Sequence, residues 1–125
     1  MSNLIDGIKI TAQPGSRYVY DAGRGLPALF SISVSSNPKT DLSYQWQVSK
    51  DSENWENISV EDPIWTKVNT HTMGINPGMT TVEHSGLKFR CEISADGYIT
   101  KYSNIAKLKV SAEPVTLTSD RFNAS

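Results

Sequence analysis

Apolar and polar residues alternate along most of this chain. Every second residue is apolar, and nearly all residues between are Ser, Gln, Lys, Arg or Glu, in the runs Ala28–Val34, Leu42–Val48, Leu87–Ile93 and Ala106–Val110. Successive side chains of a strand point to opposite faces, so this period of two predicts strands with one buried and one wet face. Ile8–Ala12 and Tyr18–Tyr20 are shorter pieces of the same kind. The three-and-four spacing of an amphipathic helix is never sustained over three turns.

Turn residues divide these runs at short intervals. Asn37-Pro38 and Asp96-Gly97 are the clearest turn signals. The pattern predicts about seven to nine short strands with turns every 8–12 residues or so. Strands with one apolar face must cover one another, which predicts an all-β sandwich of two antiparallel sheets. Between residues 58 and 82 the alternation is too weak to assign strands.

The 125 residues fit one domain. We place the sandwich domain at residues 8–112, an N-terminal arm at residues 1–7 and a C-terminal tail at residues 113–125. The tail loses the alternation after Pro114 but carries Val115 and Leu117. A terminal strand, a docking arm and a loosely ordered tail all fit this segment.

Charge and cysteine content narrow the function classes. The chain has 12 basic and 13 acidic residues without a block of like charge, which argues against a nucleic-acid partner. No apolar run approaches the roughly 20 residues of a membrane span, so we expect no membrane insertion. The first ten residues lack the basic and apolar regions of a secretory signal, and the single Cys91 cannot form an internal disulfide. We therefore expect folding in a reducing cytoplasm, unless the chain is cut from a longer protein.

Catalytic and metal-binding patterns are weak. His71 and His84 have no metal-ligand spacing, and Cys91 alternates inward with Phe89 and Ile93, as an inert buried thiol would. The acidic residues between Asp51 and Asp62 match no calcium loop, and solvated turn carboxylates explain them better. We therefore predict no catalytic residue, no metal site and no cofactor, and a protein that is not an enzyme.

Two segments resemble a known fold family. Tyr44-Gln45-Trp46-Gln47 resembles strand C of an immunoglobulin-like domain, and Ser85 to Cys91 resembles the approach to strand F. The longer strings YQWQVSKDSENWENI and GLKFRCEIS resemble the immunoglobulin-like modules of bacteriophage virion proteins and bacterial surface proteins, over about residues 5 to 112. The resemblance implies an immunoglobulin-like two-sheet sandwich whose structural core contains Phe30, Ile32, Trp46, Phe89, Cys91 and Leu108.

The chain departs from that family pattern at two positions. Strand B should carry the partner of Cys91 near Ile32, where there is no cysteine, so the resemblance implies a sandwich without a disulfide. Phe30, Ile32 and Val34 would fill that space. The tyrosine-corner position holds Phe89, which has no hydroxyl to donate.

Immunoglobulin-like sandwiches bind partners through end loops or sheet faces. Aromatic, arginine and methionine side chains are frequent in contact surfaces. The candidate contact surface is accordingly Tyr18, Tyr20, Arg24, Met73, Met79, Tyr98, Lys101 and Tyr102. The alternative is that Tyr18 and Tyr20 cover an edge of the core and that Tyr102 is partly buried. We expect Trp55 to stack on the hairpin that follows strand C.

The resemblance implies a non-catalytic bacteriophage virion structural protein, either a capsid decoration or a tail-associated module. Such a protein would attach to other virion proteins of the capsid or tail and adhere weakly to host-surface glycans. It would be made in the host cytoplasm and displayed on the virion surface. The alternative is a carbohydrate-binding or adhesin module of a larger protein on a bacterial cell surface.

Overall fold

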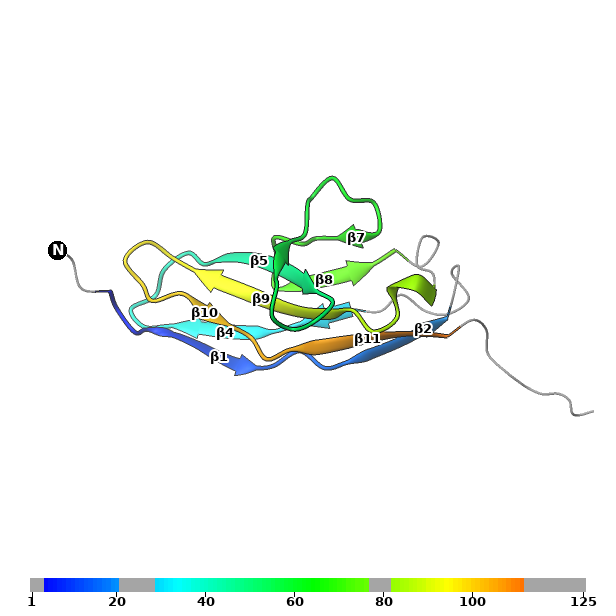
Figure 1. Ribbon diagram of the computed structural model, residues 1–125. Helices are drawn as coiled ribbons and strands as arrows, with labels where there is room; N and C mark the ends of the chain where they lie inside the picture. The colour runs from blue at the N-terminus through cyan, green and yellow to red at the C-terminus, as the bar shows by residue number, and fades with distance from the viewer. Residues whose placement is uncertain (1–3, 21–28, 77–81, 112–125) are drawn as a thin grey trace, which may run out of the picture.

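The computed structural model of the protein describes residues 4–20, 29–76 and 82–111. The described part contains eleven strands, one short 3₁₀ helix and no α-helix, so the predicted all-β class is confirmed (Figure 1). The elements are β1 (Ile8–Ala12), β2 (Arg17–Tyr20), β3 (Leu29–Ser31), β4 (Ser33–Ser36), β5 (Ser43–Ser49), β6 (Glu56–Asn57), β7 (Trp65–Thr66), β8 (Thr72–Ile75), η3 (Val82–His84), β9 (Lys88–Ser94), β10 (Lys101–Tyr102) and β11 (Ala106–Ser111).

One layer is a six-stranded sheet in the order β2-β11-β9-β5-β6, with β10 also paired to β9. Its centre is the antiparallel pair β5 and β9, whose register sets Trp46 opposite Cys91 and Val48 opposite Phe89. At one edge β2 runs parallel to β11, the last strand of the described residues.

The other layer is built from β3-β8-β7 and from β1-β4. β3 and β4 are separated only by Ile32, whose N–H donates to the carbonyl oxygen of His71 at 3.0 Å. They are therefore two halves of one strand, which joins both small sheets into a single layer. The described chain starts at one end of the sandwich and leaves β11 at the opposite end (Figure 1).

The core lies between the two layers. Burial alternates strictly along β9 and β11, with Phe89, Cys91 and Leu108 facing inward. The ring of Phe30 lies 5.0 Å from that of Phe89 and 6.3 Å from that of Trp46, measured between ring centres. All six residues that the resemblance placed in the core, Phe30, Ile32, Trp46, Phe89, Cys91 and Leu108, are buried here. Cys91 is a free thiol, as predicted for a sandwich without a disulfide.

Side chains hold the strands together where the backbone pairing is interrupted. Between β10 and β11 the hydroxyl of Ser103 accepts the N–H of Cys91 at 2.9 Å. Between β1 and β2, Oε1 of Gln13 accepts the N–H of Asn104, just before β11, at 2.8 Å, and the hydroxyl of Ser16 accepts the N–H of Lys107 in β11 at 3.0 Å. The sheet register therefore continues through these breaks.

The described part of the predicted N-terminal arm lies against the sandwich. The N–H of Ile5 donates to the carbonyl oxygen of Gly97 at 2.8 Å, and the carbonyl oxygen of Ile5 accepts the N–H of Ile99 at 2.8 Å. Gly7 packs so closely against the carbonyl oxygen of Asn37 that a side chain has no room there. The predicted tail, residues 113–125, lies outside the described residues.

Candidate functional site

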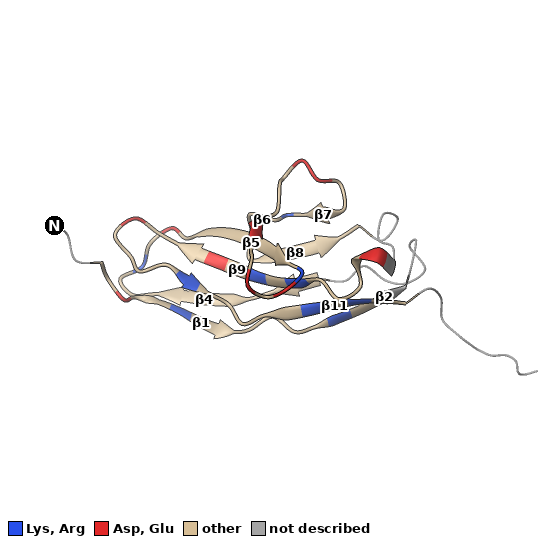
Figure 2. Ribbon diagram, viewed as in Figure 1, with Lys and Arg blue, Asp and Glu red and all other residues tan. Residues whose placement is uncertain are grey.

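The solvent-facing side of the six-stranded sheet, which we call the outer face, carries the most distinctive side-chain arrangement of the described chain. Alternation along β9 turns Lys88, Arg90 and Glu92 toward solvent, and alternation along β11 does the same for Lys107 and Lys109. Figure 2 shows basic segments along β9 and β11, whereas acidic residues gather in the loops beside β6 and β7.

Arg90 lies between two aromatic rings at the centre of this face. Its guanidinium carbon is 4.4 Å from the ring centre of Trp55 and 4.3 Å from that of Tyr102. Its Nε donates to Oε1 of Gln47 at 2.7 Å, and Gln47 donates in turn to Asn57 at 2.9 Å. Because each cation–π contact contributes about 0.5–1 kcal/mol at an exposed site, the three side chains order one another. We call Trp55, Arg90 and Tyr102 the arginine stack.

The turn between β5 and β6 presents Trp55 to Arg90. Asp51 caps this turn by accepting the N–H groups of Glu53 and Asn54 at 2.9 and 2.8 Å, and a bond from the hydroxyl of Ser49 at 3.0 Å. These donors, led by the N–H of Asn54, hold the pKa of the Asp51 carboxyl below its usual value. The carboxylate stays ionised and the turn keeps its shape.

β10 supplies the other aromatic ring. The register sets Tyr102 opposite Glu92, and the hydroxyl of Tyr102 donates to the Glu92 carboxylate at 3.0 Å. This bond raises the pKa of Tyr102, while the charge of Arg90 acts in the opposite direction. The ring remains 46% exposed, so it is both fixed and accessible.

Two further cross-strand pairs complete the outer face. Tyr18 on β2 lies opposite Lys109 and is 77% exposed. Lys107 on β11 lies opposite Lys88 on β9. Like charges directly opposite one another weaken a sheet. The ammonium group of Lys88 also donates to the carbonyl oxygen of Lys50 at 3.3 Å.

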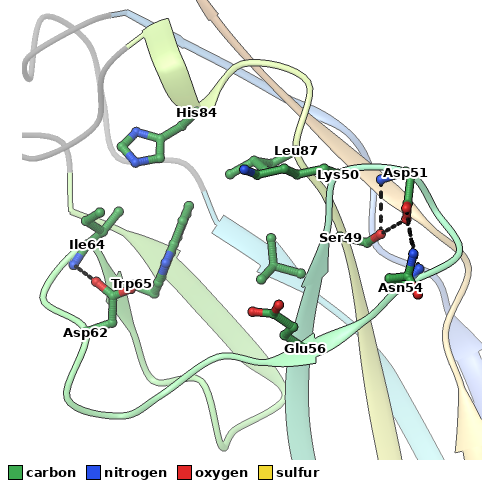
Figure 3. A pocket seen from close by; sticks show the side chains of 11 residues that line it. Ser49, Lys50, Asp51, Asn54, Glu56, Asp62, Ile64, Trp65, His84 and Leu87 are labelled. Carbon is green, nitrogen blue, oxygen red and sulfur yellow. Dashed lines mark hydrogen bonds between the residues drawn. The ribbon is translucent and has the colours of Figure 1, made fainter.

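A pocket of about 410 Å³ lies beside this face, between the β5–β6 turn and β7 (Figure 3). Its lining includes the apolar side chains of Val48, Ile64 and Trp65. The rings of Trp65 and His84 meet at 5.9 Å between centres, nearly at right angles. The charged side chains that line it include Lys50, Glu56 and Asp62.

Metal-binding and nucleophilic groups were sought among the same described residues. No group of three or more His, Cys, Asp or Glu side chains is placed to hold a metal ion in the described ranges. Burial raises the pKa of the Cys91 thiol to about 12, so the nucleophilic thiolate does not form near neutral pH. In the same ranges we find no helix of the length and apolarity that crossing a bilayer requires.

Two of the predicted contact residues are in fact core residues. Met73 is fully buried because it lies on β8, opposite Phe30, and not in a loop. Tyr98 is 8% exposed because its ring packs near Gly7 and its hydroxyl donates to the carbonyl oxygen of Pro38. The prediction of a contact role was wrong for both.

The other predicted contact residues divide into three groups. Tyr18 and Tyr102 are on the outer face, as described above. Lys101 forms an ion pair with Asp6 at 2.7 Å. Tyr20 ends β2, but its side chain lies outside the described part, as do Arg24 and Met79. Sequence reasoning assigned Trp55 to hairpin stacking and did not consider Arg90, whose outward position on β9 was the only signal available.

Both the sequence and the sheet order, with Trp46 opposite Cys91, can be compared with known proteins. No family pattern and no curated protein matches the sequence. Solved structures do match its shape. The tandem Ig repeats of Dlar match with a TM-score of 0.62 at 17% identity, over 89% of this chain and 50% of that one. Duf (Kirre) D1 matches with a TM-score of 0.58 at 13% identity, over 86% of this chain and 100% of that one.

The fold is immunoglobulin-like. Extracellular domains 3–5 of Drosophila OTK match as well, with a TM-score of 0.55 at 14% identity, over 90% of this chain and 38% of that one. This immunoglobulin-like chain therefore spans half or less of the Dlar and OTK structures. At such identities the likeness establishes the fold, while the partner has to be argued from the surface.

Proposed function

We propose that this immunoglobulin-like domain is a non-catalytic recognition module that binds a protein partner through its outer face. The observation that carries the proposal is the arginine stack. Arginine and large aromatic residues dominate the binding energy of protein interfaces, especially where they are ordered before binding. Here one arginine and two aromatic rings meet on the solvent side of a sheet.

A protein partner fits the outer face better than a glycan does. Carbohydrate binding would rest on stacking by Tyr98 and Tyr102, and Tyr98 is buried in the core. Tyr102 is itself covered on one side by Arg90. Glycan adhesion therefore has Tyr18 and a partly covered Tyr102, whereas a protein contact can use these rings together with Arg90 and the lysines of β11.

The test uses a photo-crosslinking amino acid at one of two positions. Position Lys107 lies on the outer face, and Lys9 on β1 is an equally exposed lysine of the other layer. We expect a partner to be captured from position 107 and not from position 9. Its affinity, measured with the purified partner, should then fall about tenfold or more in Tyr102→Ala, the loss typical of an interface hot spot. Equal capture at both positions, or unchanged affinity in Tyr102→Ala, would contradict the proposal.

We further propose, from the sequence resemblance, that the module is displayed on a bacteriophage particle, attached to a capsid or tail protein after synthesis in the host cytoplasm. A bacterial cell surface is the alternative location. The immunoglobulin repeats compared above include extracellular domains of an insect protein, so they do not add support for a virion. Co-sedimentation with purified particles, lost in Tyr102→Ala but not in Lys9→Ala, would support virion display, and the absence of co-sedimentation would oppose it.

A further inference from the structure

Arg90 retains unused hydrogen-bonding capacity at the centre of the outer face. A guanidinium has five N–H donors, and among the described residues only the one on Nε has a hydrogen-bond partner, the side-chain oxygen of Gln47 at 2.7 Å. No hydrogen bond joins either terminal nitrogen to another described residue. These nitrogens form the part of the guanidinium that pairs with two oxygens at once.

The guanidinium is also held in a fixed orientation. Trp55 covers one side at 4.4 Å and Tyr102 provides a second ring at 4.3 Å. The bond to Gln47 fixes rotation within the plane, and Asn57 holds Gln47. A flexible arginine loses rotamer entropy when it binds, and this one has lost much of that freedom beforehand.

The surrounding charges favour an anion. Lys88 is two residues before Arg90 on the same side of β9, and Lys107 lies opposite Lys88. Glu92 is the one opposing charge on this stretch of β9, and its carboxylate already accepts the hydroxyl of Tyr102. An incoming anion would relieve the repulsion between the paired lysines.

We propose that Arg90 binds a carboxylate, the side chain of an aspartate or glutamate of the protein partner, through its two terminal nitrogens. Planar bidentate pairing distinguishes arginine from lysine, and a carboxylate matches it in shape and charge. Trp55 and Tyr102 flank the paired groups, and the lysines of β9 and β11 steer the acidic segment toward them. This inference rests on the recognition function proposed above and names the chemistry of the partner.

The experiment titrates the intact protein with a capped peptide, acetyl-Gly-Glu-Gly-Asp-Gly-amide, at low ionic strength. Its control is the same peptide with Gln and Asn in place of the acids. NMR follows the Arg90 Nε–H and the Trp55 indole N–H signals. We expect a saturable shift of both with the acidic peptide and none with the amide peptide. Equal shifts with both peptides, or shifts confined to Lys107 and Lys109, would overturn the inference.

Two variants separate the guanidinium from general electrostatics. Arg90→Lys keeps the charge but loses the planar guanidinium group. Its affinity for the acidic peptide should be about tenfold or more lower than that of the parent, as expected when a bidentate charge-assisted pair is lost. Lys109→Gln removes one charge from the same face. It should lower the affinity for the acidic peptide less than threefold, because it loses only a long-range attraction that salt screens. Equal binding by Arg90→Lys and the parent overturns the carboxylate site. If that variant also binds the crosslinked partner normally while Tyr102→Ala does not, the recognition face stands and only the carboxylate inference fails.

Discussion

Replacing Ser103 with alanine tests whether a side chain completes the central sheet. The Ser103 hydroxyl accepts the N–H of Cys91 and donates to the carbonyl oxygen of Asn104, each at 2.9 Å. Ser103 is 7% exposed and Cys91 is fully buried. The alanine variant would leave the Cys91 N–H without a partner in a place where water has little access.

The structure sets the size of the effect. The N–H of Ser103 donates to the carbonyl oxygen of Cys91 at 2.9 Å, and alanine keeps this backbone bond, so β9 and the segment after β10 remain joined in the variant. Asn104 is exposed, and water can replace the lost bond to its carbonyl oxygen. The loss is then one buried unsatisfied donor, which destabilises a protein by about 1–3 kcal/mol. At a urea dependence of about 2 kcal/mol per molar, a loss near the middle of that range lowers the unfolding midpoint by about 1 M.

Urea unfolding followed by tryptophan fluorescence measures this difference. Hydrogen exchange adds a local measurement, because the Cys91 amide should exchange faster in Ser103→Ala while the amides of β5 keep their protection. Ser103→Thr, which keeps the hydroxyl, is the matched control and should stay within about 1 kcal/mol of the parent. A loss below about 0.5 kcal/mol together with a protected Cys91 amide would refute the reasoning.

Three further predictions concern the core and the β5–β6 turn. Trp46 is fully buried and donates its indole N–H to the carbonyl oxygen of Thr70 at 2.8 Å, so Trp46→Ala should lower the free energy of unfolding by about 3–5 kcal/mol in urea; a loss below about 1 kcal/mol would contradict its central place. Burial raises the pKa of the Cys91 thiol from 9.0 to about 12, so stability present below pH 9 should be lost as the pH rises toward 12. The free energy of unfolding of Cys91→Ala should fall less steeply over the same pH range. In the folded parent protein, Cys91 should react slowly with an alkylating reagent at pH 9. N–H donors lower the pKa of Asp51 from a usual value of 3.8, so the stabilisation that its carboxylate provides should be lost as the pH falls below that value. The melting temperature of Asp51→Asn should therefore fall less than that of the parent as the pH is lowered. The melting curves of Glu53→Gln, the control, should match those of the parent.

The two-layer fold could be read from the sequence because its central strands have one wet face. Alternation predicts β9 and β11 nearly to the residue, and it places Trp46 inside. Alternation does not predict the points where the backbone pairing of strands is interrupted. Ser103 replaces a backbone partner with a hydroxyl, and such side-chain bonds follow no period in the sequence. Short strands such as β6, whose two residues are both exposed, leave no apolar pattern to read.

The contact surface was predicted less well because burial depends on distant segments. Tyr98 follows a hairpin turn, a place where aromatic rings are often exposed. It is buried because the N-terminal segment, through Gly7, and the loop at Pro38 close over it. Met73 precedes Pro77-Gly78 by four residues, and in the sequence it resembles a loop residue, but its pairing with Phe30 makes it part of the core. Neither partner is near in sequence.

The arginine stack shows the same limit on the functional side. Its three members come from a turn, from β9 and from β10, and only the sheet register brings them together. Ordering an arginine removes up to about 2 kcal/mol of rotamer entropy, and two exposed cation–π contacts return about 1–2 kcal/mol. The hydrogen bond from Nε to Gln47 adds to these contacts, so the ordered arginine is offset within the domain itself. The stack holds a guanidinium whose terminal nitrogens have no hydrogen-bond partner among the described residues, on an open sheet face, which is the arrangement that the proposed recognition role requires.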